Sequence, residues 1–378
     1  MALELDVTHG DPLDRLERRL GIKAGTPPGV GRPIAVLLAV AVLPLAVLAA
    51  IDSQLGALIR DPLVLGRLVI ALPLLQLARP PVAGAVARAL TQCVTTGLVA
   101  PEESPRFEQT VARATRMRDS LLALAVFTVL AFGASLAGRK AALLPFAGSW
   151  ARSGDGVSLA GWWYLLVSLA VFDLVRLRWL WRILVWWRFV FGLSRLPLRL
   201  MPAHPDRVGG LGVLGNVAPS LAMLVFGLTV NYGFDFRARI LVGGAKLASL
   251  YIPMVGIPLL FLLWMLTPMA FFMPQLFRAR NTGKMEYGQL AARYTRSFDE
   301  RWIAKGEGSD AKLLGTQDIQ SLADLANSYA VVDGMRPIPL TIGSVRPLLL
   351  AAVVAMIPAL EAEIPLKEIL LTVLKALR

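Results

Sequence analysis

Residues 34–51 read IAVLLAVAVLPLAVLAAI, a run of apolar residues without one charged side chain. The hydrocarbon core of a bilayer is about 30 Å thick, and roughly 20 helical residues cross it. The run therefore predicts a membrane-spanning helix. Because a polar stretch precedes it and no small-residue cleavage site with a polar mature chain follows, we interpret it as a retained span rather than as a signal peptide.

Six further apolar runs follow the first. Of the 378 residues, 56% are hydrophobic and 17% charged, whereas a soluble domain carries about a quarter charged residues. The sequence predicts an all-α, polytopic membrane helix bundle of six or seven transmembrane helices with helical cytoplasmic inserts. The further predicted spans lie at 63–78, 119–137, 160–175, 213–233, 252–275 and 343–360.

The basic residues predict the orientation of the bundle. In the segments before the last span, 27 Lys and Arg residues lie in one alternating set of connections and 7 in the other. Because positive residues are retained on the cytoplasmic side, we expect a cytoplasmic N-terminal segment at 1–33. The rest, 34–378, is predicted as one transmembrane domain with cytoplasmic inserts at about 79–118 and 277–342.

The net charge of +13 does not indicate a nucleic-acid-binding protein here. The basic residues lie mostly between apolar runs, where they meet headgroups, so the predicted partner is a bilayer with anionic lipids. A homo-oligomer and a cytoplasmic partner protein stay open. With Cys93 as the one cysteine and His9 and His204 as the two histidines, we expect no metal site and no cofactor.

The most distinctive motif is residues 204–215, which read HPDRVGGLGVLG. Its glycines spell G-x-G-x-x-G, but no strand precedes them, so we reject a dinucleotide site. Three interpretations remain: a tight turn capped by Asp206, an anion or lipid site at the free amides of a helix start, and an acid–base pair of His204 with Asp206. The ligand or gate candidates are His204, Asp206, Arg207, Gly209, Gly210 and Gly212.

Polar residues in or next to the predicted spans are candidates for lining a pathway, because charges facing lipid are costly. The segment 175–200 is rich in Arg and Trp, which suits a helix that continues past the membrane surface with a basic face. The pathway-lining candidates are Arg67, Asp173, Arg188, Arg195 and Asn231.

Two other segments bear on function. The run 252–275 contains four prolines, which predict a kinked or broken helix, and broken helices form ion sites in many transporters. Within 277–342, Thr316 is a predicted helix cap, and the apolar residues that follow at helical spacing must pack against something. That apolar face comprises Ile319, Leu322, Leu325 and Tyr329.

These features predict a channel or carrier for a small ion or solute, with a preference for anions if arginines line it. The alternative is a membrane scaffold or sensor that binds a partner through its cytoplasmic helices. A third is a membrane-embedded enzyme acting on a lipid headgroup through His204 and Asp206. No H-E-x-x-H, G-x-S-x-G or P-loop motif occurs, so we assign no catalytic residue, and the enzyme is the least favoured of the three alternatives.

Four strings resemble a family of uncharacterised bacterial inner-membrane proteins, and they run through most of the chain. The resemblance implies a bacterial inner (plasma) membrane location and a single membrane domain, and it implies no catalytic residue. It also implies an acidic residue soon after the first string, whereas this chain has Arg79 there. The strings are RLVIALPLL at 67–75, RMRDS at 116–120, HPDRVGGLG at 204–212 and LGTQDIQSLADL at 314–325.

Overall fold

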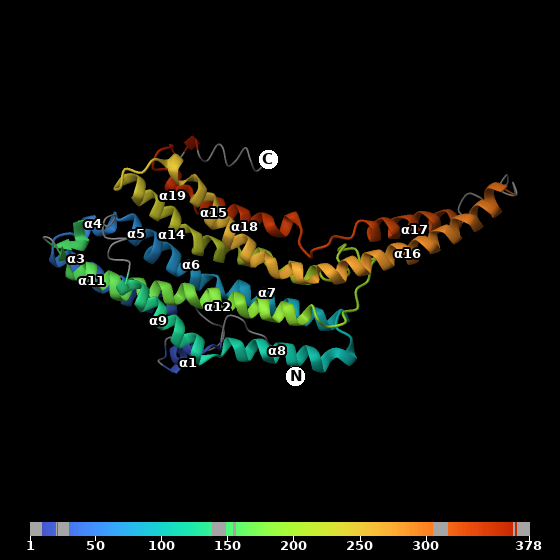
Figure 1. The fold of residues 1–378 in the computed structure, drawn as a ribbon, viewed down its shortest axis with the longest axis horizontal. Helices are drawn as coiled ribbons and strands as arrows, with labels where there is room; N and C mark the ends of the chain where they lie inside the picture. The colour runs from blue at the N-terminus through green and yellow to red at the C-terminus, as the bar shows by residue number, and fades with distance from the viewer. Residues whose placement is uncertain are drawn as a thin grey trace.

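The chain folds into a long bundle of helices, shown by a computed structural model (Figure 1). The structure describes residues 10–19, 21, 30–137, 149–153, 156–304, 317–365 and 367–368. Within these residues, six helical stretches are long and apolar enough to cross a membrane. The protein is therefore a multi-pass, all-α membrane protein. The stretches are Gly31–Ile51, Pro62–Thr95, Leu159–Leu193, Gly212–Leu241, Leu247–Ala304 and Ile342–Leu360.

All seven predicted apolar runs are helical, and six of them belong to these stretches. The remaining run, predicted at 119–137, is the helix α9 (Leu121–Ala137), which has 17 described residues and is therefore slightly shorter than the six stretches. Three of the stretches are much longer than their predicted spans, up to the 58 residues of Leu247–Ala304. About 20 helical residues cross the hydrocarbon core of a bilayer, so each of these three long helical stretches extends well beyond that core.

The first two stretches are built from short helical pieces joined without loops. A π-helical segment, η1 (Leu65–Ala71), interrupts the second one. The other pieces are α2 (Gly31–Ala41), α3 (Leu43–Ile51), α5 (Pro62–Val64), α6 (Leu72–Leu77) and α7 (Arg79–Thr95). Outside them lie α1 (Pro12–Arg19), α4 (Leu55–Ile59), η2 (Pro101–Glu103) and α8 (Ser104–Arg118).

The third and fourth stretches form the middle of the bundle. The third consists of α11 (Leu159–Trp163), a π-helical segment η5 (Tyr164–Ser168) and α12 (Leu169–Leu193). It is preceded by η4 (Ser149–Ala151) and a two-stranded antiparallel hairpin, β1 (Arg152–Ser153) with β2 (Gly156–Val157). The fourth consists of α13 (Gly212–Gly215), η6 (Ala218–Leu221) and α14 (Ala222–Leu241).

The last two stretches flank a projecting hairpin. The fifth runs through α15 (Leu247–Leu266), a 3₁₀ segment η7 (Thr267–Phe272), α16 (Met273–Phe298) and η8 (Asp299–Ala304). The helix α17 (Gln317–Asp333) returns along α16, and α18 (Ile342–Val354) and α19 (Ile357–Leu360) complete the chain's last stretch. The α16–α17 hairpin extends beyond the bundle (Figure 1), and we call this side of the molecule the hairpin end.

The core lies around α14, which packs against η1, α6, α15, α18 and α19. Two glycines permit close approaches between α14 and its neighbours. A Cβ atom on Gly66 would lie 2.5 Å from the Cβ atom of Phe234, and one on Gly233 would collide with the carbonyl oxygen of Ala355. Small residues let membrane helices approach in this way, so α14 packs closely against η1 on one side and against the end of α18 on the other.

Tryptophans satisfy backbone groups that prolines release. Proline has no N–H, so Pro268 leaves the carbonyl of Trp264 without its helical donor, and the indole of Trp187 on α12 donates to that carbonyl at 3.0 Å. In the same way the indole of Trp163 donates to the carbonyl of Val40, four residues before Pro44. The path 252–275 thus changes from α-helix to a 3₁₀ segment at Thr267 and stays helical throughout, without separated half-helices.

Packing of α17 against α16 covers most of the apolar face that is predicted after residue 316. Leu322, Leu325 and Tyr329 are half-buried on α17, which packs along α16, whereas Ile319 is 45% exposed. The predicted cap Thr316 lies outside the described residues. At the base of the hairpin, Lys284 pairs with Asp333 at 2.5 Å.

We expect Trp187→Phe to lower the free energy of unfolding by about 1 kcal/mol, the net worth of one hydrogen bond. In the Pro268→Ala variant, residue 268 regains an N–H that can donate to the carbonyl of Trp264. Trp187→Phe should therefore lower the free energy of unfolding by less in that variant than in the wild type. Thermal unfolding of the four proteins in detergent measures this coupling. Equal losses in both backgrounds would show that the indole contributes only packing.

Candidate functional site

The carboxylate of Asp206 organises the glycine-rich loop between α12 and α14. It accepts hydrogen bonds from the backbone N–H groups of Val208 at 2.8 Å, Gly210 at 3.1 Å and Gly212 at 2.9 Å. The Nδ1 atom of His204 lies 2.8 Å from the Oδ1 atom of Asp206. The predicted pair of His204 with Asp206 is therefore formed, and the carboxylate is also committed to the loop itself.

The backbone explains why the amides converge. Arg207, Gly209 and Gly210 all have positive φ values, of 56°, 66° and 97°. Left-handed residues turn successive N–H groups toward one point and create a concave anion site. Here the chain's own carboxylate occupies that point, which corresponds to the predicted turn capped by Asp206. Burial alone would raise the pKa of Asp206, but the three N–H donors and His204 hold it below its usual value.

A second segment of the chain fixes this loop from outside. The guanidinium of Arg336 donates to the carbonyls of Asp206 at 2.7 Å and Leu340 at 3.1 Å, and its backbone N–H donates to the carbonyl of Arg207 at 2.8 Å. Gly215 lies directly against the carbonyl of Pro339. The loop therefore joins the α12–α14 connection to the α17–α18 connection.

Inside the bundle, Arg67 is the centre of a buried charged cluster. Its guanidinium donates to the hydroxyl of Tyr164 at 3.0 Å and pairs with the carboxylate of Asp235 on α14 at 2.5 Å. Arg67 and Tyr164 both lie in π-helical segments, which often occur at functional sites. The sequence predicts that Arg67 does not face lipid, but it does not identify Asp235, which lies 168 residues away, as the partner.

Further polar groups lie on both sides of that cluster along the helices. Toward the start of the second stretch, Asp61 caps α5 and accepts the indole N–H of Trp150 at 2.8 Å. Toward the hairpin end, Asp173 pairs with Arg176 at 3.0 Å within α12. Asp173 is 2% exposed, so the predicted pathway candidate is buried and paired.

Between α12 and α14 the polar contacts continue. The guanidinium of Arg176 reaches the hydroxyl of Tyr232 at 3.5 Å. The neighbouring Asn231 is buried, and its Oδ1 atom has no hydrogen-bond partner among the described residues. A buried amide oxygen without a donor is costly, so this position can accept a hydrogen bond from a solute or water.

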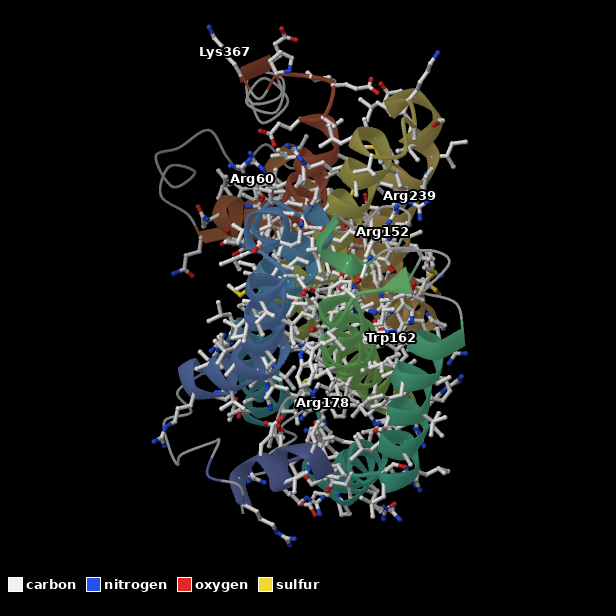
Figure 2. The ribbon with its side chains drawn as sticks, turned by 90° about the vertical axis from the view of Figure 1, so that its left-hand side faces the viewer. Arg60, Arg152, Trp162, Arg178, Arg239 and Lys367 are labelled. Atoms are coloured by element: carbon white, nitrogen blue, oxygen red, sulfur yellow. The ribbon has the colours of Figure 1, made fainter. Side chains whose placement is uncertain are left out.

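A third cluster joins the short helix α1 to the bundle through ion pairs. Asp14 lies 2.6 Å from Arg79 on α7 and 2.9 Å from Arg178 on α12. Asp11 lies 2.8 Å from Arg178 and 2.9 Å from Arg182. Figure 2 shows Arg178 above the dark blue helix α1. The sequence predicts only a cytoplasmic N-terminal segment at 1–33, and it does not predict the contact of α1 with the bundle.

The same cluster extends to Glu17 and perturbs Asp11. Glu17 accepts from Arg178 at 2.9 Å. Burial would raise the pKa of Asp11, but Arg178 and Arg182 lower it to about 2. Because this folded-state pKa is depressed, the contact is at full strength above the ordinary carboxyl pKa, near 3.9, and is lost as the pH falls toward 2. Arg79, which stands where the family resemblance implies an acidic residue, is therefore paired with the carboxylate of Asp14 on α1.

The predicted candidates do not form one site. Arg67, Asp173 and Asn231 are buried in the bundle, whereas Arg188 is half-buried near the far end of α12. Arg195 is exposed and stacks over the ring of Phe191 at 4.8 Å, and Arg207 is exposed at the glycine loop.

No group of three metal-ligating side chains occurs among the described residues. No family model, curated protein or solved structure matches this chain.

We expect Asp206→Asn to lower the free energy of unfolding by roughly 1.5–3 kcal/mol, as for the loss of a charged hydrogen-bond acceptor. The pKa of Asp206 is depressed in the fold, so its contribution is present above about pH 4 and lost below it. Melting curves should therefore differ between wild type and variant at pH 7 and converge in acid. Glu286→Gln, at an exposed position of α16, is the matched control.

Proposed function

We propose that the protein is a channel or carrier for a small ion or solute, and that the pathway follows α12 and α14. The observation that carries this proposal is the succession of buried polar groups along these helices: the Arg67 cluster, then Asp173 with Arg176, then the α1 cluster. Ionisable residues inside a membrane bundle are expensive and mark transport paths by default.

The spacing of these groups matches the thickness of a bilayer. From Tyr164 to Arg182 the third stretch contains 18 helical steps, which at 1.5 Å per residue amounts to about 27 Å. Polar side chains therefore occur at successive depths through most of the hydrocarbon core, about 30 Å thick. The oxygen of Asn231, which has no hydrogen-bond donor in the described part of the chain, lies on α14 between the Arg67 cluster and the hairpin end.

The location and orientation belong to the same proposal. The basic connections and the hairpin lie at the hairpin end, so by the positive-inside rule this end and the N-terminus face the cytoplasm of a bacterial inner membrane. Arginines occur in every one of these clusters, so we expect a preference for anions if the arginines line the path. Anionic lipids would surround the basic end.

We expect Arg67→Gln and Asp235→Asn each to reduce flux at least roughly tenfold, since each leaves a buried charge without its partner. The double variant removes both charges and should recover thermal stability while flux stays low. The measurement is uptake of chloride and other small ions by liposomes that contain the protein. Glu286→Gln serves as the control.

Two outcomes contradict the pathway. If the double variant regains stability and also wild-type flux, the Arg67–Asp235 pair is only structural. If wild-type protein, correctly folded in liposomes, carries none of the ions and small solutes tested, the transport proposal fails as a whole.

A second candidate function is supported by the projecting hairpin. The hairpin of α16, η8 and α17 extends beyond the bundle (Figure 1), and it exposes Met285 on α16, Ile303 on η8 and Ile319 on α17. Such a projection suits a scaffold or sensor that binds a partner protein. Most of the apolar face that motivated this interpretation is, however, covered by α16.

We expect Ile319→Asp to abolish partner capture in a pull-down from solubilised membranes if the hairpin is a docking element, because a charge would face the apolar contact. Ala323→Asp, also exposed on α17, is a control for added charge. Undiminished capture by Ile319→Asp would remove this candidate and leave the transport proposal untouched.

A further inference from the structure

The contact between α1 and the bundle is unusual for a docked helix. Helices on a protein surface normally bury an apolar stripe. In α1 the buried side chain is Asp14, which is fully inaccessible, while Leu16 is 49% exposed. At eight residues, α1 is also too short to be stable alone in water. Its position on the bundle therefore depends on its carboxylates.

The surface under α1 is made of three arginines from two helices. Arg79, Arg178 and Arg182 are each less than 7% exposed, and their guanidiniums converge on Asp11 and Asp14. Without α1, three positive charges would share one recess. Arginine binds carboxylate and phosphate oxygens through paired N–H groups, so this recess has the donors of an anion site.

The carboxylates do not use all of those donors. The Nε atoms of Arg178 and Arg182 are buried and have no hydrogen-bond acceptor among the described residues. A phosphate group holds four oxygens in a compact tetrahedron, of which two are non-bridging acceptors in a lipid phosphodiester and all four are free in inorganic phosphate, whereas a carboxylate presents two in a plane. Two guanidinium donors of the arginines that form the recess therefore stay unused within the described part of the chain while α1 is seated.

We propose that Arg79, Arg178 and Arg182 form a binding site for a phosphate group, and that α1 is a tethered plug that occupies it until such a ligand competes. Arg178 is 19 residues into the third stretch, about 29 Å along the helix, which places the recess near the headgroup level. The phosphate can belong to an anionic lipid or to a soluble ion. The recess also forms one end of the proposed transport path, but phosphate binding there does not require that the path carries a solute.

The test follows α1 directly in the full chain. A spin label on Arg18→Cys reports the mobility of α1, because Arg18 is exposed and Cys93 is buried and protected from labelling. The protein is placed in nanodiscs of phosphatidylcholine, and the fraction of mobile label is recorded by electron paramagnetic resonance. Phosphatidylglycerol nanodiscs and titrated inorganic phosphate are compared, with sodium chloride at equal ionic strength as the screening control.

The expected result is an immobile label in phosphatidylcholine and a mobile one with a competing phosphate. Release by phosphatidylglycerol alone identifies a lipid ligand, and release by inorganic phosphate identifies a soluble one. Asp14→Asn weakens the plug and should lower the phosphate needed for half-release roughly tenfold. Arg182→Lys keeps the charge but loses the planar fork, so it should raise that amount.

Three outcomes overturn the proposal. One is a label that is mobile in phosphatidylcholine nanodiscs before any ligand is added, since α1 would then not be seated. Another is a response to sodium chloride equal to the response to both phosphate sources, which would leave only charge screening. The third is unchanged release in Asp14→Asn and Arg182→Lys, with Glu286→Gln as reference.

Discussion

The fold depends on the rule that a backbone in lipid must find all of its hydrogen-bond partners within the protein. Prolines and helix ends repeatedly release carbonyl groups in this bundle, and neighbouring side chains take them up. Trp187 donates to Trp264, Trp163 to Val40, and Gln275 to the carbonyls of Ser194 and Leu196 beyond α12. These contacts link membrane helices that are not consecutive in the chain, so satisfying the backbone also positions the charged clusters.

The sequence predicts the helices well because hydrocarbon thickness imposes one length scale on every span. All seven apolar runs are helical, and the boundaries fail where a helix continues into water, as α12 and α16 do. Hydropathy marks where lipid ends and carries no information on where a helix ends. The four prolines of 252–275 predict a distorted helix. They do not predict that the helix stays continuous, because the carbonyl of Trp264 receives its hydrogen bond from Trp187, which lies on another membrane span.

The candidate sites were predictable in residue type and less so in partners. Arg67 had to be paired, yet Asp235 lies 168 residues away and only the packing of η1 on α14 brings them together. Asp206 could be recognised as a turn residue from the glycines that follow it. The acidic residues of α1 were hidden because a polar N-terminal segment looks solvated, and nothing in its periodicity shows that its carboxylates enter the bundle.

The unbroken passage from α15 into α16 has a mechanical consequence. The 26 residues of α16 form a rod about 39 Å long, continuous with a membrane span through η7. A tilt of about 10° at η7 would swing the far end of the rod by roughly 7 Å, given that length. Small rearrangements among the membrane helices are thereby magnified into large displacements at the tip of the hairpin.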